Sequence, residues 1–93
     1  MRTINSTNRF KKDFKRELKG RYRQAVETEL PRLIFALAND ERLPENYQDH
    51  ALSGEWIDHR DSHVKPDLVL IYRKLDDENL DLVRLGSHSE LGL

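Results

Sequence analysis

The feature that most constrains the fold is a near-continuous apolar segment at residues 67–74, Asp-Leu-Val-Leu-Ile-Tyr-Arg-Lys. Branched and aromatic residues favour strands, and a strand that is apolar on both faces must be covered on both. The segment therefore predicts a central strand of a sheet. Residues 80–85 alternate between apolar and polar positions and follow the turn at residues 76–78, which predicts a hairpin with the central strand.

Two helices are predicted before these strands. Apolar residues recur at every fourth position, with basic residues between them, at Phe10, Phe14 and Leu18. This spacing predicts an amphipathic helix over residues 7–19 with Ser6 or Thr7 as its N-cap. Apolar positions continue at spacings of three and four over residues 21–38, which predicts a second helix antiparallel to the first. Pro31 lacks a backbone N–H and is expected to kink this helix or to start it afresh.

The remaining segments complete an α+β fold. Residues 39–48 are polar and contain Pro44, which indicates a loop. Residues 56–60 are predicted as a strand and residues 1–4 as an edge strand, so the expected order is β-α-α-β-β-β. We therefore expect a two-helix hairpin packed on one face of a small, mainly antiparallel sheet. A chain of 93 residues is too short for a dinucleotide-binding sheet or a TIM barrel, so a single domain over residues 1–93 is expected.

The absence of cysteine excludes a disulfide framework, a thiol nucleophile and every metal site with a Cys ligand. The longest uninterrupted apolar stretch, residues 33–38, has six residues, which is far short of a membrane span. The polar N-terminal segment is unlike a signal peptide. We therefore expect a soluble, cytoplasmic protein with no membrane partner.

Charge is unevenly distributed along the chain, although the net charge is only −1. Residues 1–35 have a net charge of +6, and the remaining residues have a net charge of −7. A concentrated basic segment suits a polyanionic partner, because each phosphate contact releases counterions. The alternative is a solvated helix face without a partner. Under the first interpretation, RNA phosphates contact the basic side chains of the first helix, Lys11, Lys12, Lys15, Arg16 and Lys19.

All four histidines, His50, His59, His63 and His88, lie in the C-terminal half. With Asp67, Arg60 and Arg84 they form a set of proton-transfer and anion-binding groups that suits cleavage of a phosphodiester by its own 2′-hydroxyl, although His59 is equally consistent with a surface or packing residue. That reaction needs a base, a cation on the phosphorane and an acid on the leaving oxygen. Imidazoles can make both proton transfers near neutral pH, and the route needs no metal. A satisfied polar cluster without catalytic function remains an alternative, as does zinc binding, although no HExxH-like spacing is present.

At these residues the sequence resembles the YafQ branch of the RelE/ParE toxin superfamily. The segments that carry the resemblance are residues 43–56 (LPENYQDHALSGEW), residues 59–72 (HRDSHVKPDLVLIY) and residues 84–91 (RLGSHSEL). The combined pattern is far more specific than any one segment. The N-terminal segment Phe-Lys-Lys-Asp-Phe-Lys-Arg also resembles the first helix of the family.

The resemblance implies a small RelE-like fold and the toxin of a type II toxin–antitoxin pair. Such a toxin is a ribosome-dependent, metal-independent endoribonuclease that needs no cofactor, cuts mRNA in the A site and is silenced by a cognate antitoxin protein. The catalytic positions of the family fall on His50, His63, Asp67 and His88. Its basic, phosphate-binding positions fall on Arg60 and Arg84.

Two features of the resemblance bear on alternatives. The aromatic residue that commonly follows the last motif is replaced here by Gly92, so no ring is expected to stack on an mRNA base at that position. ParE-like gyrase inhibitors share the fold without the catalytic histidines. The alternatives to an mRNA-cleaving toxin are therefore a non-catalytic gyrase inhibitor of that kind and an inactive relic that only binds an antitoxin.

Overall fold

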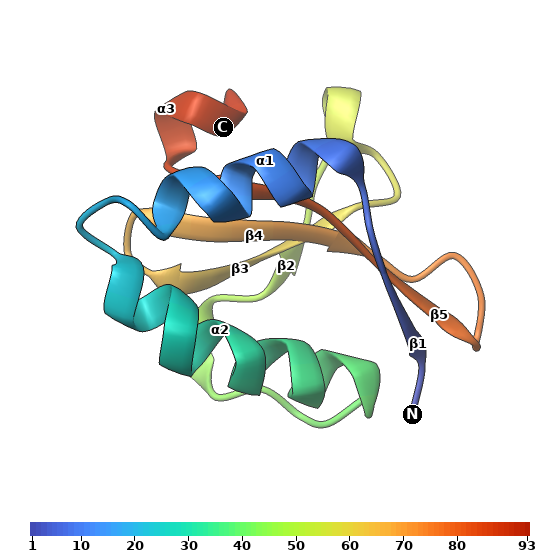
Figure 1. Cartoon of the computed structure of the whole chain (residues 1–93). Helices are drawn as coiled ribbons and strands as arrows, with labels where there is room; N and C mark the ends of the chain where they lie inside the picture. The colour runs from blue at the N-terminus through green and yellow to red at the C-terminus, as the bar shows by residue number, and fades with distance from the viewer.

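The computed structural model describes all 93 residues and contains a five-stranded sheet in the order β1-β5-β4-β3-β2 (Figure 1). The strands are β1 (Thr3–Ser6), β2 (His50–Ala51), β3 (Arg60–Lys65), β4 (Leu68–Arg73) and β5 (Asn79–Gly86). β1 and β5 are parallel, and every other neighbouring pair is antiparallel. The predicted hairpin of β4 and β5 is confirmed, and β4 is the middle strand.

Three α-helices and two short 3-10 helices join these strands. They are α1 (Asn8–Glu17), α2 (Arg23–Ala38), η1 (Glu45–Tyr47), η2 (Gly54–Trp56) and α3 (His88–Leu91). The two predicted helices are confirmed, and the Thr7 hydroxyl caps α1 by accepting a hydrogen bond from the Phe10 N–H at 3.0 Å. No new helix begins at Pro31, because Leu30 and Leu33 beside it are fully buried and their packing offsets the lost backbone hydrogen bond.

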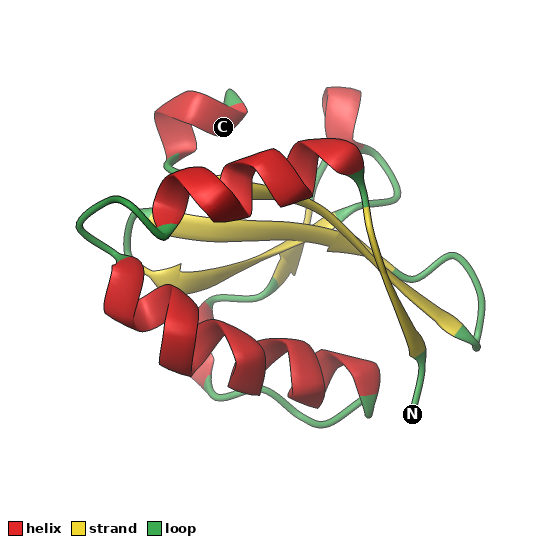
Figure 2. Ribbon diagram, in the orientation of Figure 1, coloured by secondary structure: helices red, strands yellow, loops and turns green.

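The main hydrophobic core lies between the two long helices and one face of the sheet (Figure 2). α2 supplies Val26, Leu30, Leu33 and Leu37, and α1 supplies Phe10. The sheet contributes the alternate residues that point toward these helices: Val64, Leu68, Leu70, Tyr72, Leu80, Leu82 and Leu85. The α+β architecture with a helical hairpin on a mainly antiparallel sheet is therefore confirmed.

The opposite face of the sheet has a much smaller apolar cluster. Val69 and Ile71 of β4 pack there against Leu91 of α3, with Leu52 and Trp56 at the side. β4 is thus covered on both faces, as its apolar sequence predicted. The elements that pack on this second face are α3 and the segment around η2.

Three elements differ from the expectations from sequence: the strand expected at residues 56–60, the helix α3, and the strand β2, where no strand was predicted. The predicted strand at residues 56–60 is wrong, because Trp56 ends a 3-10 helix and Asp58 has a left-handed backbone conformation with φ of 69°. The strand lies at Arg60–Lys65 instead, and its sequence lacks alternation because polar side chains occupy both of its faces. α3 was not predicted. No helix is both long enough and apolar enough to cross a membrane.

Candidate active site

Three of the four histidines meet on the sheet face opposite α2. His50 belongs to β2, His63 belongs to β3 and His88 begins α3. The ring centroids of His50 and His63 are 6.2 Å apart, and those of His63 and His88 are 5.1 Å apart, so His63 lies between the other two. The three rings line a cleft of about 520 Å³, here called the histidine cleft. Trp56 and the C-terminal Gly92 and Leu93 complete its walls.

Asp67 holds His88 in one orientation. The Nδ1 atom of His88 lies 2.7 Å from Asp67 Oδ1, and the backbone N–H of His88 donates to the same oxygen at 3.0 Å. These hydrogen bonds lower the pKa of Asp67, so its carboxyl group is ionised at neutral pH. An ionised carboxylate only accepts hydrogen bonds. His88 Nδ1 therefore carries the hydrogen, and Nε2 is the atom that can exchange a proton.

Asp61 lies against both of the other histidines, and sequence reasoning missed it. Its side chain is 3% exposed, with Oδ1 at 3.0 Å from His50 Nδ1 and Oδ2 at 3.9 Å from His63 Nε2. His50 Nδ1 also lies 2.8 Å from the Gln48 carbonyl oxygen, and it donates there, because Asp61 Oδ1 has no hydrogen-bond partner in the protein. Burial raises the pKa of Asp61, and the charges of the two imidazoles oppose this rise. Asp61 is thus a buried carboxyl group that lies between two imidazoles.

A buried nitrogen in this cluster also makes no hydrogen bond to the protein. It is Nε2 of His63, which lies between the other two rings. Buried polar atoms without partners are rare and require an explanation. The groups around this atom are Asp61, whose Oδ2 lies 3.9 Å away, and the rings of His50 and His88.

Arg60 does not share the histidine face. In the register of β3 and β4, Arg60 lies opposite Tyr72, whose side chain belongs to the main core. The Arg60 guanidinium forms an ion pair with Asp49, with Nε at 2.8 Å and Nη2 at 2.6 Å from Oδ1. Asp49 also accepts hydrogen bonds from the hydroxyl of Ser62, at 2.5 Å, and from that of Tyr72. The sequence grouped Arg60 with the histidines in one reactive set, but the structure places it on the other face of the sheet. Arg60, Ser62 and Tyr72 together hold Asp49, the residue that precedes His50.

Arg84 forms an ion pair with Asp13, a residue that the sequence analysis did not select. Its Nε donates to Asp13 Oδ2 at 2.7 Å, and both side chains are largely buried. Burial opposes the charge of Asp13, but hydrogen bonds from Arg84, the Leu85 N–H and Arg16 hold its pKa below the usual range. Arg84 thus links β5 to α1.

Arg16 differs from the lysines of α1 with which the sequence grouped it. It donates to Asp13 at 2.9 Å and to the Leu85 carbonyl at 2.9 Å, and it lies 3.1 Å from Glu90. Glu90 and Ser87 form the capping box that begins α3, so Arg16 ties α1 to the helix that carries His88.

The basic surface itself consists of exposed lysines. Lys11, Lys12, Lys15 and Lys19 are exposed, and none forms an ion pair with an acidic side chain. Unpaired, solvated ammonium groups remain available to a polyanion. Lys11, Lys12 and Lys15 lie on α1, whereas Lys19 lies in the turn after it, because the helix ends at Glu17 rather than at residue 19.

His59 lies apart from the other histidines. Its ring packs edge-to-face on Trp56 with centroids 5.4 Å apart, and its Nδ1 atom lies 3.0 Å from the Ile57 carbonyl. It does not line the histidine cleft. No group of three or more His, Asp or Glu side chains has the arrangement needed to hold a metal ion.

Comparison with known proteins gives consistent matches over nearly the whole chain. The family model described as "Bacterial toxin of type II toxin-antitoxin system, YafQ" matches residues 2–92. The mRNA interferase toxin YafQ of Escherichia coli K12 is 40% identical over 91 residues, which cover 97% of this chain and 95% of that protein.

Solved structures match as well. The E. coli DinJ–YafQ toxin–antitoxin complex contains a chain of 40% identity with a TM-score of 0.81, covering 97% of this chain and 96% of that one. A copper-bound mutant toxin from Helicobacter pylori is 41% identical with a TM-score of 0.85, covering 98% of this chain and 99% of that one.

Proposed function

The chain belongs to the YafQ family of bacterial toxins of type II toxin–antitoxin systems, and from this premise we propose that it blocks translation as an mRNA-cleaving endoribonuclease that acts on the ribosome. The observation that carries the proposal is the row of three imidazoles at 6.2 Å and 5.1 Å beside the buried Asp61. Acid–base cleavage of RNA requires such groups within reach of one phosphodiester.

The proposed reaction is attack of the RNA 2′-hydroxyl on the adjacent phosphorus. One imidazole takes the hydroxyl proton, and another gives a proton to the 5′-oxygen that leaves. His50 and His88 suit these two roles, because each has its Nδ1 held, by the Gln48 carbonyl and by Asp67, and keeps Nε2 for proton exchange. The products are a 2′,3′-cyclic phosphate and a 5′-hydroxyl, and no atom is left unaccounted for.

The phosphorane also needs a positive charge. Arg60 and Arg84 are bound to Asp49 and Asp13, so neither guanidinium is free to approach the substrate. His63 lies between the two proton-transfer histidines and 3.9 Å from the Asp61 carboxylate. As an imidazolium it supplies the charge that stabilises the phosphorane.

The reaction proposed here is independent of metal ions, because two imidazoles carry out both proton transfers. Copper binding by the H. pylori relative makes this claim worth testing directly. Cleavage assays with Mg²⁺ kept for the ribosome and a chelator selective for transition metals should proceed at the same rate with and without the chelator. A rate that needs added Zn²⁺ or Cu²⁺ would overturn the metal-independent route.

The partners follow from the same family membership. As the toxin of a type II pair the chain has a cognate antitoxin, and in E. coli DinJ forms such a complex with YafQ. We propose that four lysines without ion pairs contact ribosomal RNA phosphates: Lys11, Lys12 and Lys15 of α1, and Lys19 in the turn after it.

The test of this function is induced expression in a bacterial host followed by mapping of mRNA ends. Growth should stop, cuts should fall within translated codons, and co-expression of the adjacent antitoxin gene should restore growth. DNA breaks with an SOS response and intact mRNA would instead indicate a gyrase inhibitor. Normal growth with antitoxin binding retained would indicate an inactive relic.

A further inference from the structure

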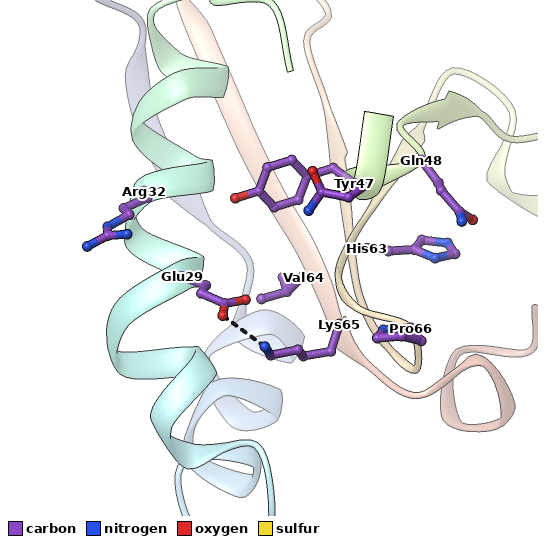
Figure 3. Close-up of a pocket in the computed structure, with 9 residues that line it drawn as sticks. Glu29, Arg32, Tyr47, Gln48, His63, Val64, Lys65 and Pro66 are labelled. Atoms are coloured by element: carbon purple, nitrogen blue, oxygen red, sulfur yellow. Dashed lines mark hydrogen bonds and ion pairs between the residues drawn. The ribbon is translucent and has the colours of Figure 1, made fainter. Parts of the chain in front are cut away.

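A second cleft adjoins the histidine cleft and has no part in the proton transfers. It has a volume of about 560 Å³ and lies between α2, η1 and the turn from β3 to β4 (Figure 3). We call it the side cleft. His63 lines both clefts, so the two clefts meet at this residue.

An ion pair between α2 and β3 lies in the side cleft. Lys65 Nζ is 2.8 Å from Glu29 Oε1, and the two side chains are 40% and 36% exposed, so a ligand in the cleft can reach both. Neither group bonds to any other side chain. A carboxylate next to an ammonium offers an acceptor and donors at one place, which complements a base edge that has both.

The other walls suit the flat face of a base. Tyr47 is half-buried against the main core and presents a ring, and Val64 and Pro66 add apolar surface. Stacking on an aromatic ring stabilises a bound base and tolerates any sequence. Gly92, where the histidine cleft could carry a ring, offers none.

Gln48 connects the side cleft to the chemistry. Its side chain lines the side cleft, and its carbonyl accepts the hydrogen bond from His50 Nδ1 at 2.8 Å. Its backbone is left-handed with φ of 47°, a conformation that costs energy for a residue other than glycine. A ligand that shifts Gln48 therefore shifts the imidazole of His50.

The charge of the side cleft favours a base over a phosphate. The ammonium of Lys65 is neutralised by Glu29, and the guanidinium of Arg32 is directed away from this ion pair (Figure 3). A phosphate would have to approach the Glu29 carboxylate, whereas an uncharged base can bond to it.

We propose that the side cleft binds the base of the mRNA nucleotide next to the scissile phosphate, and that Glu29 and Lys65 select which base is accepted. This inference rests on the proposed mRNA cleavage. It assigns sequence preference to Glu29 and Lys65, which take part in neither of the proposed proton transfers. Bases whose edges match the Glu29 acceptor and the Lys65 donor are cut faster.

The test is a cleavage profile on ribosomes programmed with mRNAs that carry every base at the positions flanking the cut. Glu29→Gln and Lys65→Met each remove one charge from the side cleft. Each should change the ratio of cleavage between the preferred and the disfavoured base at one flanking position by about fivefold or more. The charge swap Glu29→Lys with Lys65→Glu keeps the ion pair, and thus the fold, and should also alter the preferred base.

A matched control is Glu27→Gln, which breaks the pair of Glu27 with Arg23, 2.8 Å apart on the same helix, outside both clefts. Its profile should equal that of the unmodified protein. Profiles that are unchanged in all three side-cleft variants, while cutting continues, would overturn this inference alone. If the unmodified protein cuts no mRNA on ribosomes, the proposed function fails and the inference fails with it.

Discussion

Replacement of Arg60 by alanine distinguishes two possible roles of its guanidinium, which are to stabilise the phosphorane and to hold Asp49 in place. If its guanidinium stabilised the phosphorane, its loss would lower kcat by about 100- to 1,000-fold, as the loss of one donor to a developing oxyanion does. In the structure Arg60 instead binds Asp49, and its side chain is 46% exposed. An ion pair this exposed contributes at most about 1 kcal/mol, and Asp49 keeps its hydrogen bonds from Ser62 and Tyr72. We therefore expect Arg60→Ala to lower kcat by about fivefold at most.

The assay is the rate of single-turnover cleavage on programmed ribosomes, with the unfolding temperature measured in parallel. Asp49→Ala is the matched comparison, because it leaves the buried hydroxyls of Ser62 and Tyr72 without their acceptor. Each unpaired hydroxyl costs about 1–3 kcal/mol, so this variant should unfold at least about 10 °C lower and cut slowly. If Arg60→Ala lowered the cleavage rate by 100-fold or more at an unchanged unfolding temperature, the conclusion that Arg60 only holds Asp49 in place would be refuted.

Three further predictions concern other groups. Asp61→Asn should keep or raise the free energy of unfolding at pH 7, because burial raises the pKa of Asp61 and makes its charged form costly. The same variant should lower the cleavage rate by about 100-fold. Lower stability with full activity would contradict a role of Asp61 in cleavage. The pKa of Asp13 is lowered in the folded state, so its contribution to stability is complete above the unfolded pKa near 3.8 and is lost as pH falls through the folded value. Acid titration followed by circular dichroism should therefore show a shallower loss of stability below about pH 4 for Asp13→Asn than for the unmodified protein, and equal slopes would exclude Asp13. Charge reversal of Lys11, Lys12 and Lys15 together should abolish co-sedimentation with ribosomes at an unchanged unfolding temperature, and undiminished co-sedimentation would assign these lysines to solvent.

The fold was accessible from sequence wherever one physical pattern dominated. The apolar sequence of β4 predicted a strand that is covered on both faces, and the interval of four residues between Phe10 and Phe14 predicted α1. β3 was missed because Ser62 faces the Asp49 cluster while Asp61 and His63 face the histidine cleft, so neither face is apolar. Functional strands lose the alternation on which the prediction depends.

The site was only partly accessible from sequence. His50, His63, His88 and Asp67 were selected together, and the structure brings them together. The acidic partners Asp13 and Asp49 were not selected, because a carboxylate in a charged segment shows no sign of the long-range contact it makes. A usable signal existed for α3, where Ser87 and Glu90 have the spacing of a capping box.

The most direct test of the central claim is the chemistry of the cut ends together with the two histidine variants His63→Ala and His59→Ala. The unmodified protein should leave a 2′,3′-cyclic phosphate or a 3′-phosphate on the upstream fragment. His63→Ala should cut at least about 100-fold more slowly, whereas His59→Ala, whose ring lies outside the histidine cleft, should cut at the normal rate. A 3′-hydroxyl end, or full activity in His63→Ala, would contradict cleavage by the three histidines.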